Sequence, residues 1–460
     1  MPLIERRPLS VCIVIAGIAL IYFKYYKKPV AGNLKQQIDA SDDGYVKSLK
    51  PIRKPHPTQA CLEQLLEKEG AGSWPPRTSY GESWPKALRP YHEIYLALAP
   101  LLPCKDDEIS FERCLNYRAQ MRGLLRDRVQ LADVEALLCA AEQENKSILP
   151  GEAWNGFYSC IASLRHAFRW GTIPVVQLAQ AEKVIDIPSE LEVPWAHLQR
   201  RFGVTSQGGN VLSNFLCNFN ANSQIVYPIN TGMPEIIRSA EYGFAHIFLA
   251  VEAQALPMYY LVVKSFHQHS VRDRSGLLES LGQINIIVQR SLKIYYDTMV
   301  DMKISKTVWM RYVQGFQAWS AGTINATTGE YTQYDGLSGN QLLFFNIIDA
   351  FLGLDSYLTE ENMLRYMPET QRRFINSVRE HSFREKGEKV VDGEVEDMLQ
   401  NILKQIRVFR TAHRVRVKPY LGAPAPERLF MTAGKGVLGE TNAALTNLDK
   451  ILEKRLHETR

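Results

Sequence analysis

The chain has 460 residues, of which 45% are hydrophobic and 22% are charged, and both fractions are close to those of soluble globular proteins. This composition excludes a polytopic membrane protein, a collagen-like repeat and a mostly disordered chain. The net charge of +5 is small for this length, so we expect no nucleic-acid partner.

An uncharged apolar segment near the N-terminus, Pro8–Phe23, is preceded by two arginines and followed by three lysines within five residues. It is slightly shorter than a typical membrane-spanning helix, but the tyrosines and lysine after it can lie at the membrane–water interface and so lengthen the span. No small residue occupies a convincing cleavage position, and the seven scattered cysteines favour a reducing compartment over export. We therefore predict a single-pass membrane anchor over residues 1–30, rather than a cleaved signal peptide. The lysine excess predicts a cytoplasmic C-terminal body.

The remaining chain divides into three predicted parts. Residues 31–90 are rich in Pro, Lys, Gly and Ser and are expected to be a linker that wraps onto the folded body. Residues 91–190 have helical apolar spacing and predict a small helical domain, which prolines at 188 and 194 separate from a large helical domain over residues 191–460. Long helical runs are predicted at Tyr242–Val263, Leu277–Met302, Val308–Ala318, Gln341–Leu354, Pro368–Ser382 and Val395–Val417. Because alternating strand patterns are nearly absent, the predicted fold class is all-α.

Common catalytic motifs give little guidance. The sequence contains no P-loop, no HExxH and no GxSxG. The pattern GxGxxG occurs once, at Gly434–Gly439, without room for a following βαβ unit. We interpret it as a flexible turn.

A histidine at the end of an apolar helix stripe is the strongest candidate for chemistry. The stripe recurs at spacings of three and four residues, at Val395, Leu399, Ile402, Ile406 and Phe409. The next position on this face is His413, which has several basic residues around it. One interpretation is a core histidine satisfied by a hydrogen bond, with a solvated basic face beside it. The other is a haem ligand, with cations placed to offset the haem propionates.

A second candidate segment begins at Ser338, which Gln341 follows three residues later. This spacing is that of a capping box at the start of a helix. Alternatively, the turn at Ser338 and Gly339 brings backbone donors close to a ligand.

The stretch from Ser338 to Leu421 resembles the indoleamine 2,3-dioxygenase family, and weaker matches extend the likeness back to about Val193. Three motifs carry the resemblance. They are S-x-x-Q before an apolar helix containing Asp349, RYMPxxxRxF at Arg365–Phe374, and the late helix Arg410–His413.

The resemblance implies an all-α fold with a small N-terminal domain and a large haem-binding domain, and we expect a monomer. It implies haem b as cofactor and O₂ and an indole as substrates, with the pyrrole ring of a tryptophan-like indole opened to N-formylkynurenine. By this likeness His413 is the proximal iron ligand. Ser338 and Gly339 line the distal edge near the substrate amine, and Phe244 and Phe248 lie on the distal side, where a small polar residue is usual at the position of Phe248.

One departure from the family bears on the substrate. Met310 stands where the family has the arginine that pairs with the substrate carboxylate, and Arg311 is its neighbour. Arg311 either restores this contact or forms a surface ion pair. We expect a haem dioxygenase acting on tryptophan or a related indole. The alternatives are a haem-dependent oxidative tailoring enzyme on an indole without a free carboxylate, and a non-catalytic haem-binding or structural helical protein.

Overall fold

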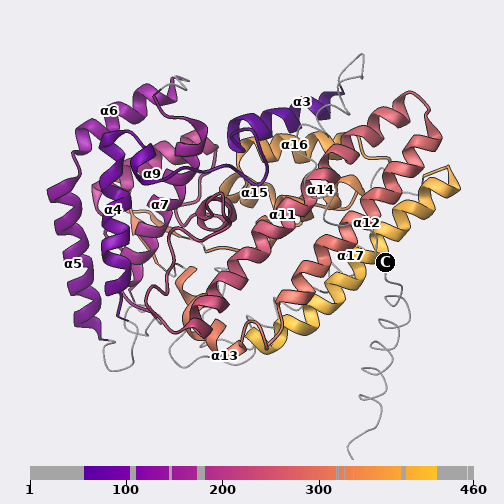
Figure 1. Cartoon of the computed structure of the whole chain (residues 1–460). Coiled ribbons are helices and arrows are strands. Elements are labelled where there is room, and N and C mark those ends of the chain that lie inside the picture. The colour runs from indigo at the N-terminus through magenta and orange to yellow at the C-terminus, as the bar shows by residue number, and fades with distance from the viewer. Residues whose placement is uncertain are drawn as a thin grey trace, which may run out of the picture. The chain divides into compact units, whose positions relative to one another are not determined.

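Helices make up most of the computed structural model of the chain (Figure 1). The structure describes residues 56–103, 110–143, 148–173, 182–317, 319, 321–325, 327–334, 336–384, 390–421 and 453. Its helical content confirms the predicted all-α class. The anchor predicted for residues 1–30 and the turn predicted at Gly434–Gly439 lie outside these residues.

A first group of helices comprises α4 (Arg89–Leu98), α5 (Phe111–Arg128), α6 (Leu131–Glu142), α7 (Gly151–Trp170) and α9 (Ser189–Phe202). Helix α7 packs against α4, α5 and α9, and almost all of its residues are buried. It ends at Gly171, whose φ of 61° is the left-handed conformation that favours glycine after a helix. Short helices accompany this group: η2 (Gly81–Ser83), η3 (Lys86–Leu88), η4 (Ala99–Leu101), α10 (Val211–Asn214) and η5 (Leu216–Asn218).

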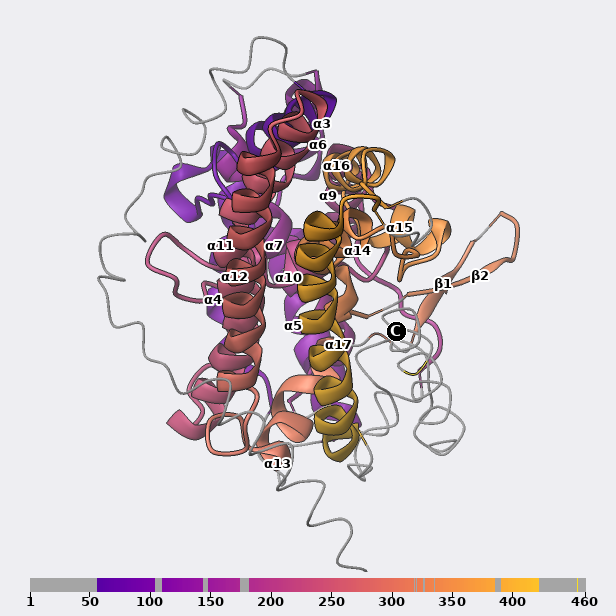
Figure 2. The ribbon, with the colours of Figure 1, turned by 90° about the vertical axis from the view of Figure 1, so that its right-hand side faces the viewer.

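A second group comprises α3 (Pro57–Gln64), η1 (Leu65–Glu69), α11 (Glu235–Ser270), α12 (Arg274–Thr298), α14 (Leu343–Phe351), α15 (Glu360–Tyr366), α16 (Glu369–Glu380) and α17 (Gly393–Leu421). Figure 2 shows the long helices α11, α12 and α17, and α12 packs against both of the others. Helix α12 begins after Asp273, whose carboxylate accepts the backbone N–H of Gly276 and so satisfies a donor of the first turn. Helix α14 packs against α11 and α16, and α3 covers α16. The domain boundary predicted near residue 190 stays a prediction.

The helix predicted over Val308–Ala318 is not a continuous α-helix, so this prediction was wrong. The chain forms α13 (Lys306–Trp309), then a π-helix, η6 (Met310–Gln314), then a 3-10 turn, η7 (Gly315–Gln317). The carbonyl of Tyr312 accepts a hydrogen bond from the side chain of Asn230 (3.1 Å), and the carbonyl of Phe316 accepts one from Trp170 (2.9 Å). A tertiary donor thus occupies the carbonyl of Tyr312, which a regular α-helix over these residues would use internally, whereas Phe316 lies in the last turn, where carbonyls lack an internal partner.

The strands in the described part form one small hairpin. Strand β1 (Gly322–Ile324) pairs antiparallel with β2 (Tyr331–Gln333), with Thr323 opposite Thr332. The chain then reaches η8 (Gly339–Gln341), which precedes α14.

Helix α11 is, among the described helices, the one long and apolar enough to cross a membrane. In its most apolar window 67% of the residues are buried inside the protein. That burial is expected of the core helix of a folded body. It neither supports nor weakens the anchor predicted for residues 1–30.

Candidate functional site

His413 lies where the buried stripe of α17 ends. The five apolar residues predicted to form this stripe are all buried. His413 itself is half-buried, and its Nδ1 lies 2.9 Å from the hydroxyl oxygen of Tyr295 on α12. Its ring is stacked on that of Phe409, with 5.5 Å between the centroids. Burial lowers the pKa of His413 to about 4, so the imidazole is neutral near pH 7 and keeps one nitrogen lone pair.

Helix α14 is joined to α17 one turn before this histidine. Arg410 donates a hydrogen bond to Asp349 (2.6 Å), and both side chains are largely buried. The ring of Phe345 is stacked on Phe409 at 5.1 Å. A buried ion pair and an aromatic stack therefore fix the register between α14 and α17.

Two other arginines of α17 also have partners. Arg416 donates to the backbone carbonyl of Tyr296 (3.0 Å), and its guanidinium lies over the Tyr296 ring. Arg414 lies 3.8 Å from the carboxylate of Glu453. These arginines of the basic cluster predicted around His413 are thus engaged with their neighbours, which differs from a freely solvated charged face.

Phe244 and Phe248 are part of an aromatic wall, by which we mean the rings of Phe215, Phe244, Phe248 and Trp309. Phe248 is stacked on Phe215 at 4.6 Å, and Phe244 meets Phe248 edge-on at 5.5 Å. Trp309 meets Phe244 at 5.6 Å. The two predicted residues lie four apart on α11, so they share one helix face, and α10 and α13 bring the other two rings to it.

Gly339 faces this wall. A Cβ atom on Gly339 would lie 4.0 Å from Cε1 of Phe248, with no closer neighbour. Gly339 is exposed and Ser338, beside it, is half-buried. The structure therefore brings the predicted residues Gly339, Phe248 and Phe244 to one place, with Ser338 at its edge.

The capping box predicted for Ser338 and Gln341 is absent. Ser338 precedes η8 but makes no side-chain cap, and α14 starts later, after Leu342. The side-chain carbonyl of Gln341 instead accepts the backbone N–H of Val211 at the start of α10 (3.1 Å). This correction favours the second interpretation, in which the turn is held by long-range contacts and leaves Ser338 and Gly339 open.

Glu252 fixes the start of α14 against α11. Its buried carboxylate accepts hydrogen bonds from Trp74 (2.7 Å), from Tyr259 (2.6 Å) and from the backbone N–H of Phe344 (3.0 Å). Burial raises the pKa of this carboxyl group. Glu252 lies one turn after Phe248, so the wall and the aromatic residues of α14 are held in a fixed relation.

Arg311 lies on the π-helix η6 and is half-buried. Its guanidinium carbon is 5.5 Å from the ring centroid of the adjacent Tyr312. Trp309 packs on Phe244, and Val313 lines the same cavity as Phe244. Arg311 is two residues from both Trp309 and Val313 in the sequence, so its side chain points to a different side of the helix. None of its described contacts is to Phe244, Phe248 or Ser338.

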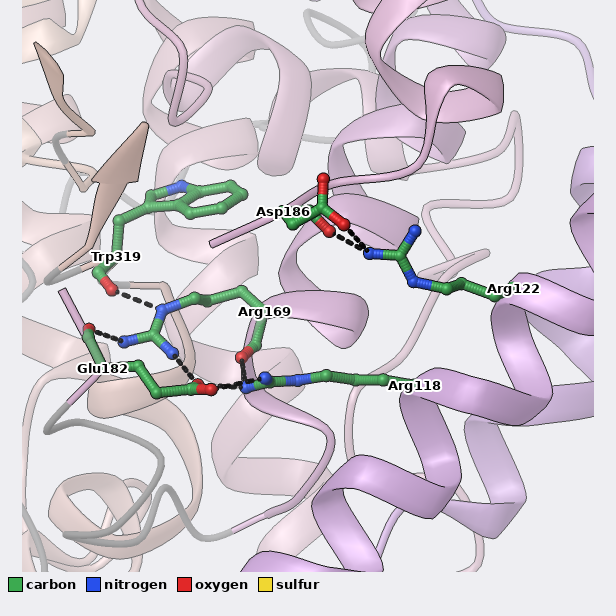
Figure 3. A network of polar contacts seen from close by, with 6 residues as sticks. All are labelled: Arg118, Arg122, Arg169, Glu182, Asp186 and Trp319. Carbon is green, nitrogen blue, oxygen red and sulfur yellow. Dashed lines mark hydrogen bonds and ion pairs between the residues drawn. The ribbon is translucent and has the colours of Figure 1, made fainter. Parts of the chain in front are cut away.

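The first group of helices holds the segment between η6 and the hairpin. Arg169 of α7 donates through Nε to the carbonyl of Trp319 (2.8 Å), as Figure 3 shows. The same guanidinium pairs with Glu182 (3.3 Å), which Arg118 also engages with both of its terminal nitrogens. His166 lies 3.0 Å from the carbonyl of Phe316. Buried side chains of α7 therefore set the path of the chain that leads to Ser338.

A cavity lies beside the aromatic wall, between α7 and α11. Its volume is about 440 Å³, counting the part open to solvent. Phe215 and Phe244 line it together with Ser163 and His166 of α7 and the buried carboxylate of Glu241. His413, Ser338 and Gly339 are not among its lining residues. The cavity thus adjoins the wall through Phe215 and Phe244 and is not lined by those candidates.

The donor set at His413 fits a haem. Among the described residues no group of three or more His, Cys, Asp or Glu side chains is placed to hold a bare metal ion. A haem iron needs one imidazole nitrogen from the protein on its proximal side, within apolar surroundings. His413 is neutral, its Nδ1 is engaged by Tyr295, and Phe409 packs on its ring, so Nε2 is the nitrogen left to bind iron.

Two elements of the site were missed by sequence reasoning. The contact of Tyr295 with His413 depends on α12 packing against α17, and the residues are 118 apart in sequence. The contact of Trp309 with Phe244 depends on the end of α13. The only sequence signal for Tyr295 was a pair of tyrosines inside an apolar helix, which is common in cores.

Comparison with known proteins covers the candidate residues. Among curated proteins none matches the sequence. The model of the family described as Indoleamine 2,3-dioxygenase matches residues 122–449, which is more than half of the chain and includes every candidate residue named above.

Proposed function

The chain belongs to the indoleamine 2,3-dioxygenase family and is a haem dioxygenase, and from this premise we propose that it inserts O₂ into the indole ring of tryptophan or a related indole. The product would be of the N-formylkynurenine type. We propose further that the cofactor is haem b and that Nε2 of His413 is its protein ligand.

The observation that carries the proposal is the connection between His413 and the aromatic wall through α14. Phe345 of α14 is stacked on Phe409, the ring that packs on His413. The N–H of Phe344, the preceding residue, is bonded to Glu252, one turn from Phe248. One short helix thus links the candidate iron ligand to the candidate substrate wall, and the family match spans both.

The residues of the chain position the cofactor and form the surroundings of the substrate. Haem iron, when bound, activates O₂ for addition to the indole, so the protein needs no strong acid or base of its own. His413 holds the cofactor in place, and the buried pair of Arg410 and Asp349 keeps α17 from sliding along α14. Phe248 and Phe244 present an apolar surface of the shape that a flat indole packs on, and they exclude water. Ser338 and Gly339 form the open edge, where a hydroxyl and a backbone N–H are available to a substrate amine or carboxylate.

The specificity of the site depends on whether a side chain binds the carboxylate of a substrate such as tryptophan. A carboxylate in an apolar pocket needs a cation, because leaving it unpaired in a low dielectric is costly. Met310 carries no charge, and Arg311 is the next residue on η6. The uncharged side chain at Met310 favours the second candidate function, oxidation of an indole that has no free carboxylate.

The test compares L-tryptophan with tryptamine, measuring kcat/KM and identifying the product of each. If Arg311 clamps a carboxylate, Arg311→Met removes a contact of about 2–5 kcal/mol, and turnover of L-tryptophan alone falls by a large factor while haem content is unchanged. If Arg311 is a surface residue, both substrates change by no more than about 1 kcal/mol in transition-state stabilisation. Arg290→Met, an exposed change on α12, is the matched control.

The same assay separates these functions from a non-catalytic role. Ring-opened product from L-tryptophan supports the first function, and turnover of tryptamine in preference to L-tryptophan supports the second. A haem-loaded protein that converts neither indole would contradict both.

We also propose that the chain is a monomer held at a membrane by residues 1–30, with its catalytic body in the cytoplasm. The support is the apolar segment Pro8–Phe23 and the three lysines that follow it. Recovery of the full chain in the membrane fraction, and of a chain lacking Met1–Lys28 in the soluble fraction with its haem, is the expected result. Loss of haem binding on that deletion would assign the apolar segment to the folded core instead.

A further inference from the structure

The hydroxyl of Tyr295 is the polar group that faces the inner nitrogen of His413. Its oxygen lies 2.9 Å from Nδ1, and the two rings meet edge to face with 5.3 Å between centroids. Tyr295 also packs on Phe409 at 5.3 Å, and Phe409 is stacked on the imidazole with 15° between the ring planes. Two rings, one from α12 and one from α17, therefore fix the plane and the rotation of the imidazole.

The direction of this hydrogen bond follows from iron coordination. An imidazole that binds iron through Nε2 gives that nitrogen's lone pair to the metal, so its proton is on Nδ1. Nδ1 then donates, and the Tyr295 oxygen accepts. The carboxylate of Asp349 is bonded to Arg410, one turn before His413, whereas the Nδ1–H of His413 donates to the phenol of Tyr295.

We propose that Tyr295 is a positioning residue for the haem ligand, which sets both the tautomer of His413 and how strongly the imidazole donates electrons to iron. This inference rests on the proposed function, because it assumes that His413 binds the haem. A hydrogen-bond acceptor on Nδ1–H raises the basicity of the coordinated nitrogen. A neutral phenol does this less than a carboxylate would, because hydrogen bonds to charged acceptors are roughly twice as strong. The proximal imidazole is thus oriented firmly but kept a neutral, moderate donor, which keeps the ferrous state accessible.

The chain offers a matched pair of variants to test this proposal. Tyr295→Phe removes the hydroxyl and keeps the ring that packs on Phe409. Tyr296→Phe makes the same change at the next residue, which also packs on Phe409, at 5.9 Å, but has no described contact with His413. A merely structural role in holding α12 against α17 would affect the two variants alike.

The experiment uses the full chain loaded with haem b and reads three properties that are independent of turnover. Tyr295→Phe should lower the iron–histidine stretching frequency of the ferrous protein in resonance Raman spectra. It should raise the ferric/ferrous reduction potential, because a weaker donor stabilises the ferric state less. Haem transfer to excess apomyoglobin should become on the order of tenfold faster, the lower end of what loss of such a partner costs in metal affinity. Tyr296→Phe should leave all three properties as in the unaltered chain.

The outcomes separate this inference from the proposed function. His413→Ala is included to test the ligand itself, and it should abolish the Soret band of a five- or six-coordinate histidine-bound haem. If His413→Ala loses the haem and Tyr295→Phe shifts no property relative to Tyr296→Phe, the role of Tyr295 is overturned and the proposed function stands. If His413→Ala keeps the normal spectrum, the haem site itself is misassigned.

Discussion

Phe248 fills the space where the resemblance to known dioxygenases leads one to expect a small polar side chain. Its ring is buried, stacked on Phe215 and close to the open face of Gly339. A serine there would add a hydroxyl and remove a ring, whereas phenylalanine makes this part of the aromatic wall bulky and wholly apolar. Under the proposed function, the size of this side chain is expected to affect which indoles fit.

Replacing Phe248 with leucine should widen the site toward bulkier indoles. Each aromatic pair is worth about 0.5–1.5 kcal/mol beyond its buried area, and Phe248 makes two in the wall, so a loss of roughly 1–3 kcal/mol in stability is expected. The kcat/KM for a ring-substituted tryptophan should rise relative to that for tryptophan. Steady-state assays with both substrates measure this ratio.

The matched control is Phe374→Leu, a buried ring of α16 that packs on Tyr259 away from the wall. It should lower stability but leave the substrate ratio unchanged. Equal ratios in the two variants would show that Phe248 has no part in selecting the substrate.

The role of a single residue can be predicted from the sequence when its partners are close to it in the chain. His413 was identified because five residues on its own helix place it on the buried face. Tyr295 was not, because its role is defined by a contact between α12 and α17 that no periodicity encodes. The same holds for Gln341, whose local spacing predicted a cap but whose partner, Val211, is 130 residues away.

Helix α7 supports the site although it carries none of the candidate residues. It is almost wholly buried, and its Arg169 side chain donates to the carbonyl of Trp319 in the segment that follows η6 (Figure 3). Arg169 is completely buried, while the nearby pair of Arg122 and Asp186 is exposed. The two arginines thus offer a comparison of buried and exposed contacts in one small region.

Arg169→Met should destabilise the protein by about 1–3 kcal/mol, because it leaves the buried carbonyl of Trp319 without its donor. The cost is limited because Glu182 keeps its contacts with Arg118. Arg122→Met should change stability by at most about 1 kcal/mol, as for other exposed ion pairs. Urea unfolding of the two variants, monitored by tryptophan fluorescence, measures both values, and equal shifts would contradict a supporting role for Arg169. Arg169→Met should also raise KM if the segment it holds positions Ser338.

The helices themselves were predicted closely where their apolar spacing is regular. The expected runs beginning at Tyr242, Leu277 and Val395 lie within or overlap α11, α12 and α17. The run at Val308–Ala318 has similar spacing, yet it forms a short α-helix, a π-helix and a 3-10 turn, and Asn230 bonds to the carbonyl of Tyr312 within it. Regular spacing predicts a helix when nothing else competes for its backbone, and such competition comes from distant residues.

At the scale of the whole molecule, a group of histidines lies where α3 meets α16 and the end of α11. His56 precedes α3, and its ring lies 4.4 Å from that of His381, which follows α16. His267 is near enough to act on it electrostatically. Burial, with these two histidines, lowers the pKa of His56 to about 4. The attachment of α3 therefore depends on His56 remaining neutral.

We expect the stability of the protein to fall as the pH is lowered from about 6.5 toward 4, partly because of His56. The pKa of His56 in the folded protein lies below its unfolded value, so the unfolded chain takes up the proton first, and the contribution is fully present above the unfolded pKa of about 6.5. His56→Asn removes the titrating group but keeps a side chain suited to cap α3 at Thr58. Its melting temperature should match that of the unaltered chain at pH 7.5 and exceed it at pH 5.

The control for this comparison is His269→Gln, an exposed histidine of the last turn of α11. Its melting curve should follow that of the unaltered chain at every pH. The buried carboxyl groups of Glu241 and Glu252, whose pKa values are raised, act in the opposite sense and are common to all three proteins. A His56→Asn protein with an unchanged pH profile would rule out the histidine group as a source of acid sensitivity.

The π-helix at Met310–Gln314 has a consequence for how the length of this family's sequences can vary. A π-turn closes its hydrogen bond over one residue more than an α-turn, so it holds a residue that the helix does not need. Deleting one residue there would yield an ordinary helical turn and leave the chain on both sides in register. Such a deletion changes only which residues form the turn: without Met310, for example, Arg311 would directly follow Trp309, although no residue had been substituted.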